Sequence, residues 1–132
     1  AWDEKMRSYP DAPAGLPLVQ HGLQILMDFY HKDILSLETI VEKSSHNVAK
    51  RFQIKDRGYI REGYYADLAI IDIDKSYKVT EENILYKCGW SPFLGKTFPS
   101  SIYMTIVNGN IAFENGKINP DIPYGMQIEF DR

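Results

Sequence analysis

The sequence from Gly58 to Ile73 reads Gly-Tyr-Ile-Arg-Glu-Gly-Tyr-Tyr-Ala-Asp-Leu-Ala-Ile-Ile-Asp-Ile. Its second half, residues 66–73, is a nearly continuous apolar run. A short apolar run of this kind predicts a strand that is buried on both faces. Gly63 predicts a turn that leads the chain into this strand. The stretch therefore marks the point where a sheet begins.

Helices are predicted upstream of this strand. Prolines and a glycine make residues 1–17 a loop. The next segment places apolar residues on one face of an α-helix, at Val19, Leu23, Leu26, Met27 and Tyr30. Ser36 predicts the N-cap of a second helix. Ser44 or Ser45 is expected to end that helix, and Asn47 to cap a short third one.

Strands are predicted downstream. Residues 80–85 predict a capped helical turn, and residues 91–99 a loop. Residues 102–107 predict a strand followed by the pair Asn108-Gly109, which is typical of a type I′ hairpin turn. A second Asn-Gly pair at 115–116 predicts another turn, and the tail is expected to be extended. Because helices precede strands, the order of elements predicts an α+β fold or pieces of two domains.

The composition favours an ordinary globular chain. The 132 residues are 44% hydrophobic and 25% charged, with a formal net charge of -3 and scattered basic residues. This balance argues against a nucleic-acid or anionic-membrane partner, and no apolar run approaches the roughly 20 residues of a membrane-spanning helix. The single cysteine excludes an internal disulfide and favours a reducing compartment. The first residue is Ala1, which suggests a processed or truncated chain; a trimmed initiator methionine is the alternative.

Few residues predict chemistry by themselves. The histidines His21, His31 and His46 do not form a recognised metal-binding spacing, so a structural role is favoured for each. Three aspartates, Asp67, Asp72 and Asp74, could serve acid–base work or bind a cation, but turn and solubilising roles are favoured. Cys88 follows Lys87 directly, and side chains adjacent in an extended segment point apart, so a reactive thiol is disfavoured. The pair Tyr64-Tyr65 is better explained by packing than by an aromatic binding surface.

The loop Ala12-Pro13-Ala14-Gly15-Leu16-Pro17 is more informative. A glycine between prolines, just before a helix, can present backbone N–H groups to an anion or an amide. Most loops of this composition are only turns, so local patterns alone predict a domain without an assigned role.

Three stretches, in this order, resemble the cyclic amidohydrolases. Residues 11–21, Asp-Ala-Pro-Ala-Gly-Leu-Pro-Leu-Val-Gln-His, are similar to a dihydroorotase loop that leads into the final barrel helix. Residues 47–72 resemble the signature N-P-A…G-x-I-x-x-G-x-x-A-D-L-x-x-x-D, with Val48 in place of proline and Tyr65 where a small or charged residue is common. Ser-Pro-Phe-Leu-Gly-Lys at 91–96, with residues 105–117, resembles S-P-F-x-G…T-I-V-x-G-x-x-v-x-x-x-G-K.

The resemblance implies a fold and a division of the chain. Residues 1–57 would be the last loop and helices of a (β/α)₈ TIM-barrel catalytic domain. Residues 58–118 would be strands of a composite β-sandwich domain, and residues 119–132 a C-terminal tail. A whole barrel takes about 250 residues, so the chain is expected to be a C-terminal fragment.

The resemblance also implies a function. Such enzymes hold one or two zinc ions through an HxH pair, a carboxylated lysine, two further histidines and an aspartate, and no residue here matches any of these ligands. We therefore expect no catalytic or metal-binding residue in this chain, with Ala14 and Gly15 lending backbone hydrogen bonds to the substrate ring. The parent is expected to be a cytoplasmic, zinc-dependent dihydroorotase of pyrimidine biosynthesis that acts on dihydroorotate.

Two alternatives remain at this stage. The parent could be another cyclic amidohydrolase, such as an allantoinase or a hydantoinase, because these share the second and third stretches. The chain could instead be a non-catalytic β-sandwich module used for assembly. If it is a fragment, we expect it to be inactive alone and to self-associate through apolar surface that the barrel would otherwise cover.

Overall fold

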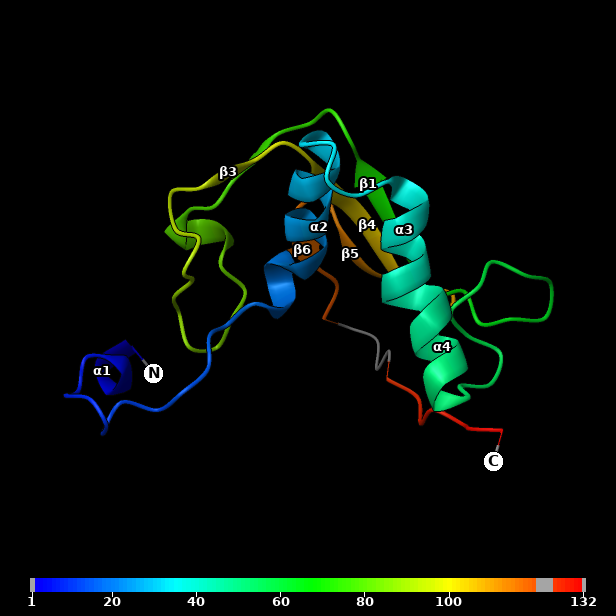
Figure 1. The fold of residues 1–132 in the computed structure, drawn as a ribbon, viewed down its shortest axis with the longest axis horizontal. Helices are drawn as coiled ribbons and strands as arrows, with labels where there is room; N and C mark the ends of the chain where they lie inside the picture. The colour runs from blue at the N-terminus through cyan, green and yellow to red at the C-terminus, as the bar shows by residue number, and fades with distance from the viewer. Residues whose placement is uncertain (1, 121–124, 132) are drawn as a thin grey trace.

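The computed structural model describes residues 2–120 and 125–131, with helices first and strands second (Figure 1). The helical elements are α1 (Trp2–Lys5), the 3₁₀ turn η1 (Val19–His21), α2 (Gly22–His31), α3 (Leu37–Val41), the π-helical η2 (Glu42–His46), α4 (Asn47–Phe52) and the 3₁₀ turn η3 (Glu81–Asn83). The strands are β1 (Leu68–Asp72), β2 (Tyr77–Lys78), β3 (Thr97–Phe98), β4 (Ser101–Val107), β5 (Asn110–Glu114) and β6 (Lys117–Ile118). The order confirms a mixed helix-and-sheet fold, but α1 contradicts the prediction that residues 1–17 are entirely loop.

Strands β1, β4, β5 and β6 form an antiparallel sheet in the order β1-β4-β5-β6. The two Asn-Gly turns are confirmed: Asn108 and Gly109 have φ of 50° and 80°, and Asn115 and Gly116 have 50° and 83°. Positive φ at both central residues is what a type I′ turn requires. The turn chemistry of the sequence thus fixes both hairpins of this sheet.

Strands β2 and β3 form a separate two-stranded sheet in which Tyr77 pairs with Phe98. The prediction that residues 91–99 are entirely loop was therefore wrong, because β3 lies within them. Phe98 is fully buried, so this short strand is held by packing of its side chain and not by a long ladder. The predicted capped turn at 80–85 is confirmed, since Thr80 and Asn83 form a reciprocal capping box around η3.

Strand β1 differs from its prediction. It was expected to be buried on both faces, yet Ala69, Ile70 and Asp72 are exposed, with Ile70 42% accessible. The reason is topological: β1 lies at the edge of the sheet and pairs only with β4. An edge strand with apolar residues on both faces leaves one set of side chains without cover inside this chain.

The second and third predicted helices are continuous in the structure, contrary to the prediction of a break between them. Ser36 caps α3 as expected, its hydroxyl accepting a hydrogen bond from the Thr39 N–H at 3.2 Å. Ser44, however, does not end the helix. Its hydroxyl donates to the Ile40 carbonyl at 2.7 Å, and the chain continues through the π-helical η2 into α4. Asn47 therefore has helical backbone angles and does not act as a cap.

The inward face of α2 agrees only in part with the prediction: Met27 is buried as expected, whereas Leu23, Leu26 and Tyr30 are half-buried. Val19 is 94% exposed, while His21, Gln24 and Met27 are buried. The buried hydrophobic residues among those described are few: Met27, Ile40, Ala49, Val79 and Phe98. Helices α2 and α3 lie in front of the four-stranded sheet in Figure 1, but so small a core leaves much of their apolar surface open.

His21, the last residue of η1, packs in a cage of aromatic rings from residues 77–98. The cage holds η1 and the start of α2 against that segment. His21 is fully buried, and four rings surround it with centroid distances of 5.6–6.4 Å, those of Tyr77, Tyr86, Phe93 and Phe98. Its Nδ1 lies 3.5 Å from the Tyr86 hydroxyl, and its Nε2 has no hydrogen-bond partner among the described residues. Burial in this cage lowers the pKa of His21 below its ordinary value of 6.5.

Gln20 adds polar contacts next to the cage. Its side-chain amide donates to the Asn83 carbonyl at 2.7 Å and accepts from the Leu85 N–H at 2.8 Å. Its backbone N–H donates to the Tyr86 hydroxyl at 2.9 Å. One side chain and one peptide group thus fix the position of η1 against residues 83–86.

Hydrogen bonds among Arg57, Asp67 and Asn108, called the clamp below, join the start of β1 to the β4–β5 turn. Arg57 donates to the Asp67 carboxylate and, at 2.6 Å, to the Asn108 side chain. The other oxygen of Asp67 accepts from the Asn108 N–H at 2.8 Å, and the Gly109 N–H donates to the Ala66 carbonyl at 3.0 Å. The Arg57 guanidinium also lies 4.1 Å from the centre of the Tyr65 ring. The clamp explains why the Ala-Asp pair precedes this strand.

The approach of the 58–63 loop to α4 generates a prediction about two glycines. Gly58 has φ +81°, and a Cβ there would lie 2.6 Å from the Ala49 Cβ and 3.2 Å from the Ser45 carbonyl oxygen. Gly63 has φ +80° with no atom within 4 Å of its hypothetical Cβ. Gly63→Ala should destabilise the fold by about 1 kcal/mol from φ alone. Gly58→Ala should lower the free energy of unfolding by about 2–4 kcal/mol, because the overlap of its Cβ with Ala49 adds to the cost of the positive φ.

Thermal and denaturant unfolding of the two variants measures this difference. Gly63→Ala is the matched control, since it shares the backbone conformation but not the close approach. Equal losses of stability in both variants would show that residue 58 does not lie against α4.

A second prediction concerns His21 and pH. The unfolded chain takes up a proton near pH 6.5, whereas the folded chain does so only at lower pH. Stability should therefore fall as the pH decreases below about 6.5, by at most about 1.4 kcal/mol per pH unit. His21→Gln, which does not titrate, should be less stable at pH 7 but lose less stability between pH 7 and pH 5. Parallel stability curves for the two proteins would contradict the buried, neutral histidine.

Candidate functional site

The loop predicted to contact substrate lies on the surface between α1 and η1. Ala14 and Gly15 are both exposed, and Gly15 has φ +90°, a conformation that disfavours any side chain. The chain is turned before this point by hydrogen bonds from the Asp11 and Ala12 N–H groups to the Ser8 carbonyl, at 2.7 and 3.2 Å. The Ser8 hydroxyl also donates to the Asp11 carboxylate at 2.9 Å.

Lys5 engages two of the carbonyl groups of this loop. The Lys5 ammonium donates to the Pro13 carbonyl and, at 2.5 Å, to the Gly15 carbonyl. Within the described residues, no acceptor bonds the N–H of Ala14 or Gly15. Two unengaged peptide donors on one turn can bind a carbonyl or a carboxylate, which is the role predicted for them.

The three histidines occupy separate structural positions. His31 Nε2 lies 2.9 Å from the Ser100 hydroxyl and 3.1 Å from the Ile73 carbonyl. The Ser100 hydroxyl also donates to the Ile73 carbonyl, at 2.9 Å, so His31 belongs to a local hydrogen-bond network between the end of β1 and the start of β4. His46 stacks on Tyr59 with ring centroids 4.2 Å apart, and His21 lies in its cage. The structural role predicted for all three agrees with these contacts.

The acidic residues and the thiol do not converge either. Asp67 belongs to the clamp with Arg57, while Asp72 lies at the end of β1 and Asp74 just beyond it. The Cys88 thiol is half-buried and points toward the Trp90 carbonyl, 3.9 Å away. In the part of the chain that the structure describes, no group of three His, Cys, Asp or Glu side chains could hold a metal ion. No described helix is long and apolar enough to cross a membrane.

One charged cluster was not identified from the sequence. Asp28 on α2 accepts hydrogen bonds from Lys96 at 2.9 Å and from Lys32 at 3.0 Å. These ammonium groups, Lys96 foremost, hold the pKa of the largely buried Asp28 below its usual range. Lys96 also lies 4.6 Å from the centre of the Phe98 ring, beside the cage. Only the spacing of Asp28 and Lys32 was visible in the sequence, since Lys96 is distant along the chain.

A groove lies between α2, α3 and β1. It encloses about 490 Å³, and its lining includes Leu23 and Met27 from α2, Leu37, Ile40 and Val41 from α3, and Leu68, Ala69 and Ile71 from β1. The lining is mostly aliphatic, and Asp67, which pairs with Arg57, is its one acidic residue among those described. Such a groove is suited to packing against another apolar surface and not to activating water.

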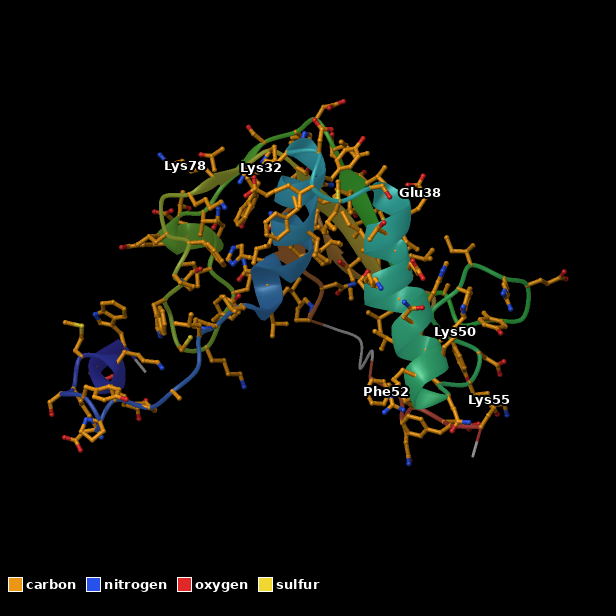
Figure 2. All side chains as sticks on the ribbon, viewed as in Figure 1. Lys32, Glu38, Lys50, Phe52, Lys55 and Lys78 are labelled. Atoms are coloured by element: carbon orange, nitrogen blue, oxygen red, sulfur yellow. The ribbon has the colours of Figure 1, made fainter. Side chains whose placement is uncertain are left out.

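The other long side chains on this flank point outward. Lys50 on α4 and Lys55 just after it are exposed in Figure 2, as is Glu38 on α3. Lys55 pairs with Glu129 of the tail at 3.5 Å, and the neighbouring Ile54 forms a bridge with Phe130. The tail thus pairs with residues 53–55, just beyond the end of α4, where the structure describes it; residues 121–124 lie outside the described part. This pairing secures the end of the chain without creating a polar site.

Comparison with known proteins identifies the family of this chain. A model of the amidohydrolase family matches residues 27–113. A dihydroorotase from Endomicrobium trichonymphae is 37% identical over 113 residues, which cover 85% of this chain and 27% of that protein. An allantoinase from Desulfitobacterium hafniense is 35% identical over 105 residues, 79% of this chain and 23% of that protein.

A solved structure has a similar fold over most of this chain. The L-hydantoinase (dihydropyrimidinase) from Arthrobacter aurescens superimposes with a TM-score of 0.79 at 29% identity, over 89% of this chain and 27% of that one. The chain therefore spans about a quarter of the length of the relatives it matches. Since the family model covers well over half of its residues, the chain belongs to the amidohydrolase family.

Proposed function

We propose that this chain is the C-terminal part of a dihydroorotase, the zinc-dependent hydrolase that interconverts dihydroorotate and N-carbamoyl-aspartate in cytoplasmic pyrimidine biosynthesis. The observation that carries the proposal is the loop at Ala14 and Gly15, whose N–H groups are free to bind a cyclic amide while its carbonyls are held by Lys5. The 37% identical relative named dihydroorotase supports the same substrate. The role of the loop is positioning, which lowers the barrier without breaking a bond.

Residues 1–57 would contribute the last loop and helices of a TIM barrel, residues 58–118 strands of a β-sandwich, and residues 119–132 a tail. Two features of the fold support this division. Strand β1 has apolar residues on both faces but only one neighbouring strand, as expected of a sheet that packs against a missing layer. The aliphatic groove between α2, α3 and β1 offers a second uncovered surface.

Zinc would be held by other parts of the parent protein, because the described residues contain no suitable group of ligands. When bound in an enzyme, zinc polarises a carbonyl and lowers the pKa of a coordinated water. The contribution of this chain would be to bind the substrate ring through Ala14 and Gly15 and to close the barrel. We assign it no catalytic residue.

An allantoinase or a hydantoinase is the second candidate, favoured by the 35% identical allantoinase and by the fold of the L-hydantoinase. All three reactions open a cyclic amide. A non-catalytic β-sandwich assembly module is a further alternative, for which the uncovered groove is the supporting feature.

The activity of the full-length parent tests the proposal. We expect the parent to open dihydroorotate and to contain zinc, whereas the isolated 132-residue chain should bind no stoichiometric zinc and show no hydrolysis. Metal analysis and a spectrophotometric assay of both proteins provide the measurement. One tightly bound zinc per isolated chain would contradict the assignment, and a parent that opens allantoin or hydantoin but not dihydroorotate would favour the second candidate.

We further propose that the isolated chain self-associates through its groove. Val41 lines the groove and is 47% exposed, whereas Val19 lies outside it and is 94% exposed. Burial of the groove in a second copy would be driven by its aliphatic lining.

Light scattering of the isolated chain should therefore report a dimer or larger assembly. Val41→Glu should shift it toward monomer, because a carboxylate would be buried without a partner. Val19→Glu is the matched control and should leave the assembly intact. A monomeric wild-type chain, or equal effects of the two variants, would oppose the proposal.

A further inference from the structure

We propose that Lys5 is a positioning residue for the substrate-binding loop, fixing the Pro13–Leu16 turn so that its peptide N–H groups stay available to the substrate. The inference rests on the proposed function, since it concerns the same loop. It adds a side chain that no signature stretch contains. Lys5 lies at the end of α1, ahead of the first stretch that resembles the family.

The geometry of the contact is the first argument. One ammonium group donates to two carbonyls of a single turn, those of Pro13 and Gly15. Gly15 has φ +90°, so the turn depends on a conformation that a free loop would populate only in part. A cation that binds both carbonyls selects the conformer in which they point to the same side, which lowers the entropy lost when a substrate binds.

The second argument concerns the peptide groups themselves. The Pro13 carbonyl shares its peptide bond with the Ala14 N–H, and the Gly15 carbonyl shares one with the Leu16 N–H. A cation bound to the oxygen of a peptide polarises that peptide and makes its N–H a stronger donor. Since Pro13 and Pro17 have no N–H, the donors between them belong to Ala14, Gly15 and Leu16, and Lys5 acts on the peptides of two of them.

The third argument is that Lys5 is itself held in place. The Trp2 ring, one turn earlier in α1, packs on Trp90 with centroids 5.4 Å apart, and the Met6 N–H bonds the Trp2 carbonyl at 3.2 Å. Trp90 directly precedes Ser91, which is buried. Helix α1 therefore contacts residues 77–98, the segment that also forms the His21 cage. This contact fixes the position of the Lys5 backbone relative to the 12–17 loop.

Steady-state kinetics of the full-length parent tests the inference. Lys5→Met keeps a long apolar side chain and removes the charge; Lys5→Arg keeps a cationic donor. We expect Lys5→Met to raise KM about tenfold or more. Its kcat should change less than about threefold, because positioning of a binding loop acts mainly on substrate binding. Lys5→Arg should recover most of the loss, and Gly15→Ala, which alters the turn directly, should raise KM in the same way.

Lys75→Met is the matched control, since Lys75 is exposed in the connection between β1 and β2, outside the loop and α1, and should leave KM unchanged. An unchanged KM in Lys5→Met would overturn the inference. So would a loss of folded protein or of kcat that Lys5→Arg does not rescue, because Lys5 would then be structural. If the wild-type parent opens another cyclic amide instead of dihydroorotate, the proposed function fails, while the same variants still test Lys5 with the amide that is accepted.

Discussion

The apolar surface of α2, α3 and β1 exceeds what the chain can cover, and this constraint governs the rest of the structure. Five hydrophobic side chains are buried among the described residues, while Val41 and Ile70 remain 47% and 42% exposed. At about 25 cal/mol per Å² of apolar area, so small a core stabilises little. The relative positions of the elements therefore depend on specific polar and aromatic contacts, namely the His21 cage, the hydrogen bonds of Gln20 and the clamp at Asp67.

The features that were predicted correctly are those decided by neighbouring residues. The cap at Ser36, the capping box of η3 and the Asn108-Gly109 turn each need only a few consecutive residues of the right type. The errors arose where distant contacts decide. Ser44 or Ser45 was expected to end a helix, but the Ser44 hydroxyl bonds within the helix, and the chain continues through a π turn. The exposure of β1 depends on its place at the sheet edge, which periodicity does not reveal.

The same distinction applies to the candidate site. Ala14 and Gly15 were identified because they fall within a stretch that resembles a family loop, and their role stays a prediction. The contacts of Lys5 with its loop and of Asp28 with Lys96 were missed because these partners are not at helical or strand spacing. Lys5 reaches Pro13 and Gly15 only through the turn at Ser8, and Asp28 meets Lys96 only when β3 packs beside α2. No pattern of composition or period encodes these pairings.

Contacts between the three signature stretches explain why these stretches indicate a fold and not a substrate. Gly58 lies against Ala49, so the two halves of the second stretch touch each other. Asp67 bonds Asn108, which joins the second stretch to the third, and Lys96 of the third bonds Asp28 on α2. These residues hold elements together, so the stretches identify an architecture shared with relatives named dihydroorotase, allantoinase and hydantoinase. Under the function proposed above, substrate choice would depend on segments outside this scaffold, and within the chain the loop that Lys5 contacts would contribute to it.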